Sequence, residues 1–274
     1  MTASERLPST AIDTTTPSIA RAYDYAIGGK DNYEVDRELL RQLNQAVPEV
    51  NVIAVTNRSF LIRAVRFLAT QGRIDQYLDC GSGLPTAENT HQVAQRLNRE
   101  ARVVYVDNDP VVVAHGRALL EENENTHFLD ANIFEPQEVL ESDLVREKLD
   151  FTRPLALLQV ATLHHHSADF GLPPAEVMRG YIDALPSGSF VAFSHFLDPE
   201  NEHSEMAHRV QSILNASTSK GFFRTRTEIM EMLDGLDLIE PGLVINDEWW
   251  PDGPNLQELP PAGHCIVAAV GRKP

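Results

Sequence analysis

The residues best suited to chemistry form two short segments that together could bind a nucleoside. The first is a Gly-Ser-Gly turn at 81–83, which directly follows the apolar run 76–80. Its glycines permit positive φ angles and let a ligand approach bare backbone. The second is Asp107, which ends the apolar run 102–106 and could accept two hydrogen bonds from ribose hydroxyls. A strand, a Gly-x-Gly turn, a helix and a second strand ending in an acid are typical of a nucleoside-binding βαβ unit.

The sequence of the turn argues against a ligand with a pyrophosphate group. The dinucleotide fingerprint Gly-x-Gly-x-x-Gly requires a glycine at 86, where Thr86 stands. We expect the next helix over 85–98, and Pro85 removes one of the N–H donors that bind pyrophosphate at a helix N-terminus. The chain also lacks the Gly-x-x-x-x-Gly-Lys-Ser/Thr phosphate loop. S-adenosylmethionine, which carries adenosine and a sulfonium but no phosphate, fits this turn.

The alternative is an ordinary strand-to-helix turn with no ligand. Three carboxylates favour a ligand, because Asp79 precedes the turn, Asp107 ends the second expected strand and Asp130 follows the third. The carboxyl ends of parallel strands meet at one edge of a sheet, where ligands of open α/β folds bind.

Histidines provide candidates for a general base, which a methyl acceptor needs only if it must lose a proton. Residues 164–166 are three consecutive histidines after the fourth expected strand, and His195 follows the fifth. An unperturbed imidazole titrates near neutral pH and suits this role. We name His164 as the candidate base, although these histidines could equally contact loops and neighbouring helices.

Other classes of chemistry find little support. His203 and His208 are five positions apart, whereas i, i+4 spacing would place two metal ligands on one helical face, so we expect no metal site. A hydrolase would need the Gly-x-Ser-x-Gly elbow, which is missing from the sequence. Trp249 and Trp250 could line an aromatic substrate cleft or simply pack.

The elements that must position these residues alternate between strand and helix over most of the chain. Strands are expected at 75–80, 102–107, 126–129, 154–160, 189–193, 238–245 and 263–270. Helices are expected between them at 85–98, 110–122, 136–149, 174–185, 202–219 and 227–234. This order predicts an α/β, Rossmann-like fold with a seven-stranded, mostly parallel sheet. The last two strands predict a hairpin edge with one antiparallel strand, unlike the all-parallel dinucleotide fold.

The N-terminal part differs from this alternation. Residues 1–16 are polar and predict a disordered tail, 17–70 predict a helical cap, and 71–274 form the expected ligand-binding core. In the cap, Tyr23 lies in a segment that is either a helix ended by Gly28 or a hinge whose tyrosines face a ligand. Arg58, on the last cap helix, could reach a ligand carboxylate or remain in solvent.

Composition limits the classes of binding partner that the chain can have. The chain has 274 residues and a formal net charge of −17, which disfavours nucleic acid and anionic membranes because both are polyanions. Cys80 and Cys265 lie in apolar runs and are expected as buried free thiols of a reducing cytoplasm. We find neither an apolar run of membrane-spanning length nor a signal peptide, and therefore expect a cytoplasmic protein.

Several motifs resemble a known family. They are Arg21-Ala22-Tyr23-Asp24-Tyr25-Ala26-Ile27-Gly28-Gly29-Lys30-Asp31-Asn32-Tyr33, Asn57-Arg58-Ser59-Phe60-Leu61, Leu78-Asp79-Cys80-Gly81-Ser82-Gly83-Leu84-Pro85-Thr86, Val104-Tyr105-Val106-Asp107-Asn108-Asp109-Pro110-Val111-Val112, Ser187-Gly188-Ser189-Phe190 and Glu240-Pro241-Gly242-Leu243-Val244. The core resembles class I S-adenosylmethionine-dependent methyltransferases. The whole chain is similar to an actinobacterial family of such enzymes whose substrates are largely unassigned.

The resemblance implies a set of cofactor contacts around S-adenosylmethionine. Gly81 and Gly83 correspond to the glycines under the methionine part, Asp107 to the ribose-binding acid and Asn108 to the residue beside adenine. Asp130, with Ala131 next to it, corresponds to the acid at the adenine amino group, and Gln159 to a contact at the end of the fourth strand. Asp79, Tyr23 and Arg58 complete the expected set. Pro85 departs from the wider superfamily, where a third glycine is common, and alters the backbone path near the methionine tail.

We therefore expect an S-adenosylmethionine-dependent methyltransferase that acts on a small-molecule acceptor. Its rate would come largely from holding donor and acceptor in line at short distance. The alternatives are a regulatory protein that binds S-adenosylmethionine or a nucleoside without turnover, and an NAD-dependent oxidoreductase, against which Thr86 counts. The sequence does not indicate the oligomeric state.

Overall fold

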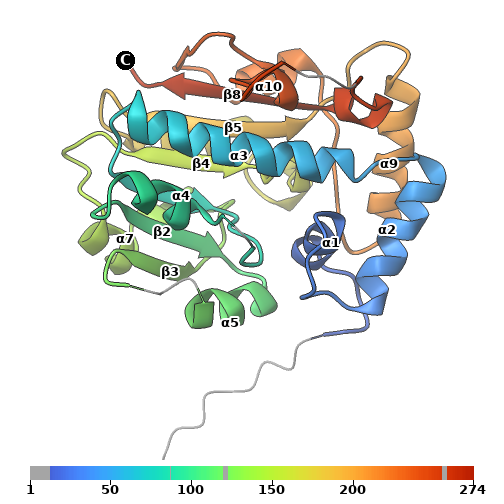
Figure 1. The fold of residues 1–274 in the computed structure, drawn as a ribbon, viewed down its shortest axis with the longest axis horizontal. Coiled ribbons are helices and arrows are strands. Elements are labelled where there is room, and N and C mark those ends of the chain that lie inside the picture. The colour runs from blue at the N-terminus through green and yellow to red at the C-terminus, as the bar shows by residue number, and fades with distance from the viewer. Residues whose placement is uncertain (1–12, 87, 120–122, 255–257) are drawn as a thin grey trace, which may run out of the picture.

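A central sheet lies between two layers of helices in the computed structural model, which describes residues 13–86, 88–119, 123–254 and 258–274 (Figure 1). The strands are β1 (Gln76–Cys80), β2 (Arg102–Asp107), β3 (Thr126–Asp130), β4 (Ala156–Val160), β5 (Phe190–Phe196), β6 (Asp237–Leu238), β7 (Val244–Ile245) and β8 (Ile266–Arg272). The helices are α1 (Ile19–Ala26), α2 (Glu34–Ala46), α3 (Val52–Thr70), α4 (Thr90–Leu97), α5 (Pro110–Leu119), α6 (Pro136–Leu140), α7 (Asp143–Lys148), α8 (Pro174–Ala184), α9 (Ser204–Ala216) and α10 (Arg226–Glu231). The predicted α/β class is confirmed.

The sheet has the order β3-β2-β1-β4-β5-β8-β6, and β8 is antiparallel to its neighbours while β1 to β5 run parallel. Eight strands form instead of the expected seven, because one edge strand is interrupted. Leu238 pairs with Gly271 and Val244 with Ala268, so the chain between β6 and β7 bulges away from β8. Pro241 lacks an N–H for the ladder and Gly242 turns at φ +85°, which explains the break.

Both faces of the sheet are covered, which is why its strands are continuous apolar runs. Side chains alternate across the sheet, so Tyr77 and Leu158 pack in the core on the α3 side. Leu78 and Leu157 pack in the opposite core, with Tyr181 of α8. All five are fully buried. The sheet is therefore a rigid platform whose strand ends hold their positions.

The cap helices gather beyond the carboxyl ends of the parallel strands. Figure 1 shows α1, α2 and α9 at the end toward which the β2 and β5 arrows point. A third apolar cluster joins residues of α2, α3, α9, β8 and the turn before α3, namely Leu40, Leu43, Val50, Ile53, Val210, Leu214 and Ile266. Farther along α3, Phe60 and Leu68 belong to the sheet core. One helix thus serves both the cap and the sheet.

Residues of α1, of α2 and of the chain that flanks them build a polar network inside the cap. The Arg21 guanidinium lies 2.8 Å from the Asp36 carboxylate, and both side chains are buried. Asp36 also accepts the backbone N–H groups of Ser18 and Tyr33 at 2.9 Å. These contacts fix the α1–α2 hairpin, and the helix ends before Gly28, which has a φ of +85°.

A second carboxylate explains the Gly-Gly pair of this segment. Asp24 accepts hydrogen bonds from the Asp31 backbone at 2.9 Å and the Asn32 amide at 2.7 Å. A Cβ on Gly29 would stand 1.9 Å from an Asp24 oxygen, so only glycine fits there. Much of this distinctive motif therefore serves the cap fold.

Two expected helices differ from the prediction. The helix expected over 85–98 begins only at Thr90, because Asn89 caps it by exchanging side-chain and backbone hydrogen bonds with Gln92. The acidic helix expected over 136–149 is divided into α6 and α7, and Ser142 caps the second through the N–H of Val145.

The remaining expectations have mixed outcomes. Cys80 and Cys265 are buried free thiols, as predicted. Within the described ranges, no helix combines the length and apolarity that a membrane span requires. Residues 1–12 of the expected tail and residues 120–122 of the helix expected over 110–122 lie outside the described residues.

Removing the cation of the buried pair should destabilise the protein strongly. In Arg21→Ala the Asp36 carboxylate stays buried without its partner, and we expect a loss of about 3–5 kcal/mol in the free energy of unfolding, measured with urea. Arg41→Ala is the matched control, because Arg41 pairs with Glu34 and Glu38 in solvent and should cost less than about 1 kcal/mol. Equal losses would contradict the structural role assigned to Arg21.

Candidate functional site

A pocket of about 640 Å³ opens where the strand ends meet the cap. Its volume lies within the range of roughly 300–1,000 Å³ that is typical of small-molecule sites. The ends of β1, β2 and β4 line one side, and α1, α2, the start of α3 and α9 line the other. Carboxylates and backbone thus face apolar helices across one cavity.

The turn after β1 brings bare backbone to this pocket. The N–H groups of Gly81 and Ser82 donate to the Val106 carbonyl at 2.8 and 3.2 Å, which folds the turn against β2. A Cβ on Gly81, at φ +77°, would meet the Thr162 methyl group at 2.4 Å. A Cβ on Gly83, at φ +63°, would have no atom within 4 Å. Gly81 is thus required for packing, whereas Gly83 leaves open space.

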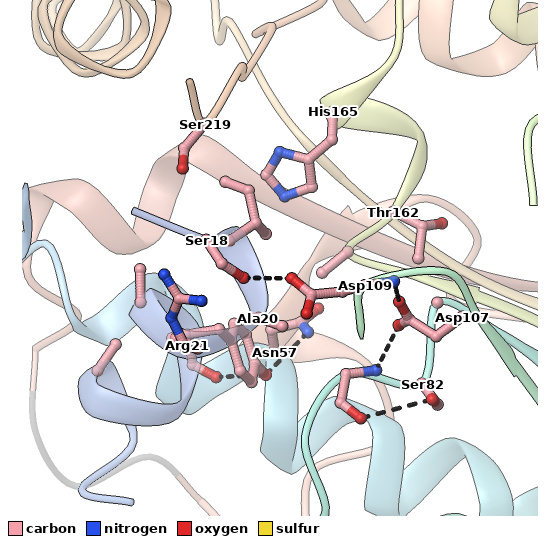
Figure 2. Close-up of a pocket in the computed structure, with 18 of the residues that line it drawn as sticks. Ser18, Ala20, Arg21, Asn57, Ser82, Asp107, Asp109, Thr162, His165 and Ser219 are labelled. Atoms are coloured by element: carbon pink, nitrogen blue, oxygen red, sulfur yellow. Dashed lines mark hydrogen bonds between the residues drawn. The ribbon is translucent and has the colours of Figure 1, made fainter. Parts of the chain in front are cut away.

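Asp107 links the two halves of the βαβ unit. Its Oδ2 accepts the Gly83 N–H and its Oδ1 accepts the Asp109 N–H, both at 3.0 Å (Figure 2). Burial raises the pKa of this carboxyl, and the two N–H donors oppose that shift. Each oxygen keeps a free lone-pair direction, so the carboxylate can still accept hydrogen bonds from a vicinal diol.

A second carboxylate lies deeper in the pocket. Asp79 is buried and accepts a hydrogen bond from the Thr90 hydroxyl at 2.7 Å. Burial raises its pKa to about 6, the Thr90 hydroxyl and the positive charge of Arg58 lower it, and the negative charge of Asp107 raises it. Two carboxylates in one cavity favour a ligand that carries positive charge.

Arg58 and Tyr23 line the pocket from the cap side. The Arg58 guanidinium donates to the Glu88 carbonyl at 2.9 Å. The Tyr23 hydroxyl donates to the Ala54 carbonyl at 3.1 Å and accepts from the Asn57 amide at 3.2 Å. Tyr23 is therefore held in place, and its ring rather than its hydroxyl is available to a ligand.

The segment 13–18, called the strap below, crosses the pocket between two distant loops. The Ser18 hydroxyl donates to Asp109 Oδ2 at 2.6 Å (Figure 2). The Pro17 carbonyl accepts the hydroxyls of Thr218 and Ser219 at 3.0 and 3.2 Å. Sequence reasoning missed these contacts because their partners are far apart in the chain. The local sequence signal was limited to Asp109, which precedes Pro110 and so occupies a position that can cap a helix.

The adjacent histidines His164 and His165 make different contacts. The ring of His164 stacks on Phe196 at 3.5 Å between centroids, and its Nδ1 accepts the Phe196 N–H at 3.3 Å. The neighbouring His165 binds the Lys220 carbonyl through Nδ1 at 2.6 Å, and its ring points into the pocket (Figure 2). His164 lines the pocket but is held by packing, whereas His165 presents a free nitrogen.

Burial keeps these histidines neutral. It lowers the pKa of His165 to about 4 and that of His195 to about 3, and it lowers the pKa of His164 and His166 as well. Arg224 holds the cluster together. Its guanidinium donates to the Leu163 and His166 carbonyls and to the His195 ring. Nothing in the sequence marked Arg224 for this role.

The structure brings most of the predicted cofactor residues together. Those that line the pocket are Gly81, Gly83, Asp79, Asp107, Asn108, Tyr23 and Arg58.

Three others are not among the lining residues. Asp130 is exposed, with a carboxylate oxygen 3.9 Å from the Arg117 guanidinium. Ala131 is buried in the core on the α8 side. Gln159 is fully buried and accepts the Thr162 hydroxyl at 2.6 Å.

Comparisons with known proteins identify the family of the chain. The sequence pattern of the S-adenosyl methyltransferase family matches residues 5–274. The chain belongs to this family. A crystal structure from Thermobifida fusca YX, whose name gives methyltransferase as a provisional assignment, has a TM-score of 0.90, is 40% identical and covers 97% of this chain and 98% of its own.

Two further solved structures extend the comparison. A DUF574 family protein from Streptomyces avermitilis has a TM-score of 0.89 and 36% identity, over 96% of this chain and 100% of its own. An O-methyltransferase family protein from Burkholderia thailandensis has a TM-score of 0.50 and 12% identity, over 86% and 66%, and shows likeness of fold alone. No curated protein matches the chain. The methyltransferase family and fold are thus established, and the acceptor is not.

The two glycines of the turn should respond differently to alanine. Gly83→Ala places a methyl group in open space and should cost only the positive-φ penalty of about 1–2 kcal/mol in free energy of unfolding. Gly81→Ala adds a clash with Thr162 and should cost a further 1–3 kcal/mol, roughly. Urea denaturation of both variants measures the difference, and equal losses would contradict the packing described here.

Proposed function

We propose that this protein transfers a methyl group from S-adenosylmethionine to a small-molecule acceptor. The observation that carries the proposal is the Asp107 carboxylate, which is fixed by two backbone N–H groups and faces the same pocket as Gly83 and Asp79. Membership of the S-adenosyl methyltransferase family supports the choice of methyl donor.

The residues present fit that donor. Asp107 would accept the ribose hydroxyls, the open side of Gly83 would admit the methionine part, and Asp79 would face its ammonium group. Arg58, on the cap side, suits the carboxylate. Asn108 lines the pocket and is the proposed contact of the adenine. Asp130, Ala131 and Gln159 are proposed only from the family resemblance, because they lie outside the lining of the pocket. When bound, S-adenosylmethionine supplies an electrophilic methyl group on a positively charged sulfur.

The chain's own residues would orient the reactants and limit access of water. The strap lies across the pocket and is held by the hydrogen bonds of Ser18 and Pro17, and residues of α1 line the same pocket. Excluding water strengthens electrostatic interactions inside the site, and holding the reactants in line lowers the entropic part of the barrier. A cavity of about 640 Å³ and a net charge of −17 support a small acceptor rather than nucleic acid.

Calorimetric titration with S-adenosylmethionine, S-adenosylhomocysteine and NAD tests the proposal. We expect binding of the two sulfur compounds at micromolar concentrations and no heat from NAD. Binding of NAD alone would contradict the assignment. Binding of the sulfur compounds with no methyl transfer to any acceptor would favour the regulatory alternative.

Removing the Asp107 carboxylate should weaken binding of the donor. Asp107→Ala deletes the acceptor of two charge-assisted hydrogen bonds, so we expect a loss of at least about 1.5–3 kcal/mol in binding free energy by calorimetry. Asp183→Ala is the control, since Asp183 is an exposed acid on α8 outside the pocket. Unchanged affinity in Asp107→Ala would remove the ribose site from the proposal.

Donor affinity should depend on pH through Asp79. Its raised pKa of about 6 means that the carboxyl loses its charge as pH falls through that value, and with it the attraction for an ammonium group. We expect affinity for S-adenosylhomocysteine to fall between about pH 7.5 and pH 5, measured by calorimetry. In Asp79→Asn the affinity should be lower at neutral pH and nearly independent of pH over this interval. A wild-type slope that persists in Asp79→Asn would assign the titration to another group.

A further inference from the structure

The half of the pocket that faces away from the glycine turn is an apolar chamber. It is defined by Leu40, Leu43, Val50, Ile53, Leu214 and Ile266, which all line the pocket and also form the cap core. The lysines, arginines, aspartates and glutamates among the described lining residues are Asp13, Arg21, Arg58, Asp79, Asp107 and Asp109. None of them lies on α2, β5, α9 or the His164–His165 turn.

The charges nearest the chamber are already engaged. Arg21 pairs with the buried Asp36. Asp109 accepts the Ser18 hydroxyl and the Val111 N–H, so its carboxylate is occupied by the strap and by the start of α5. A carboxylate or ammonium group in the chamber would therefore lose its hydration without gaining a counter-ion, which is costly. The chamber suits a neutral, largely apolar molecule.

His165 contributes a polar ring nitrogen to the lining of the pocket. The Nδ1–H of His165 donates to the Lys220 carbonyl at 2.6 Å, just beyond the end of α9. This bond fixes the tautomer, so Nε2 carries a lone pair and no proton. The ring lies 6.0 Å from Phe196, while Thr162, three residues earlier, packs on the Gly81 backbone. His165 therefore lines the pocket next to Phe196, which packs against the cap core, and on the same turn as Thr162, which packs on Gly81.

We propose that the acceptor is a neutral, largely apolar small molecule with a hydroxyl group, and that His165 Nε2 is the general base that takes the hydroxyl proton. The proposal rests on the function proposed above. The acceptor oxygen bonds to the methyl carbon as its O–H bond breaks, and the proton moves to Nε2. The bond between sulfur and methyl breaks, with its electron pair left on sulfur. Positive charge thus passes from sulfur to the imidazolium, which later releases the proton to water.

Binding comes first in the test, because it does not depend on turnover. Wild type, His165→Gln and the control His203→Gln are titrated with S-adenosylhomocysteine, and all three should bind it equally. Failure of the wild type to bind would overturn the proposed function itself. The wild-type complex is then titrated with 2-naphthol and with 2-naphthoate, and we expect 2-naphthol to bind at least about tenfold more tightly. Tighter binding of 2-naphthoate would overturn the acceptor class while leaving the methyl donor in place.

Methyl transfer from S-adenosylmethionine to 2-naphthol then tests the base. We expect the methyl ether from the wild type and from His203→Gln, and a loss of about 100-fold or more in kcat for His165→Gln, the usual contribution of a general base. Added imidazole should restore activity to His165→Ala, which a purely structural role would not allow. Full activity in His165→Gln, or a 2-naphthol complex of the wild type that forms no ether, would overturn the assignment of His165.

Discussion

The cap, the sheet and the C-terminal loop meet at one buried amide, that of Asn57. Its Nδ2 donates to the Tyr23 hydroxyl at 3.2 Å, and its Oδ1 accepts from the Ser194 hydroxyl at 2.6 Å and the Asn246 amide at 3.2 Å. Each lost bond would leave a buried polar group unsatisfied, at a cost of roughly 1–3 kcal/mol. Apolar contacts alone would let α1 slide over the strand ends, whereas these directional bonds fix it in one position.

Because the cap is fixed in this way, the pocket keeps two chemically different halves. The strand ends provide carboxylates and exposed backbone, since parallel strands end together at one edge. The cap provides the apolar chamber. Helix α3 contributes Ile53 to the chamber and Phe60 and Leu68 to the sheet core, so one rigid element sets the spacing between the halves. In-line transfer needs such a fixed spacing between donor and acceptor.

The sequence predicted the elements whose environment is uniform along their length. Strands β1 and β2 were located to within one residue, because burial on both faces makes them continuous apolar runs. Asp107 followed from its place at a strand end. The division of the edge strand into β6 and β7 was not predictable from periodicity, because it depends on how residues 239–243 bulge away from β8.

Side-chain direction in loops was harder to predict than the position of the loops. His164 and His165 are adjacent and identical in type, and only the contacts with Phe196 and the Lys220 carbonyl distinguish them. Ser18 likewise binds Asp109, which is 91 residues away in the chain, and neither segment carries a local sequence signal for this contact. These pairings are set by tertiary structure, so hydrophobic periodicity and short motifs carry no information about them.

The structure also changes the reason for excluding a pyrophosphate ligand. Pro85 cannot remove a donor from the start of α4, because that helix begins at Thr90 and Asn89 caps it. Electrostatics provides the stronger argument. Burial raises the pKa of Asp79, and the negative charge of Asp107 adds to that shift, so this part of the cavity stabilises negative charge poorly. Two phosphates would add to that repulsion, whereas a ligand with a sulfonium and an ammonium group would relieve it.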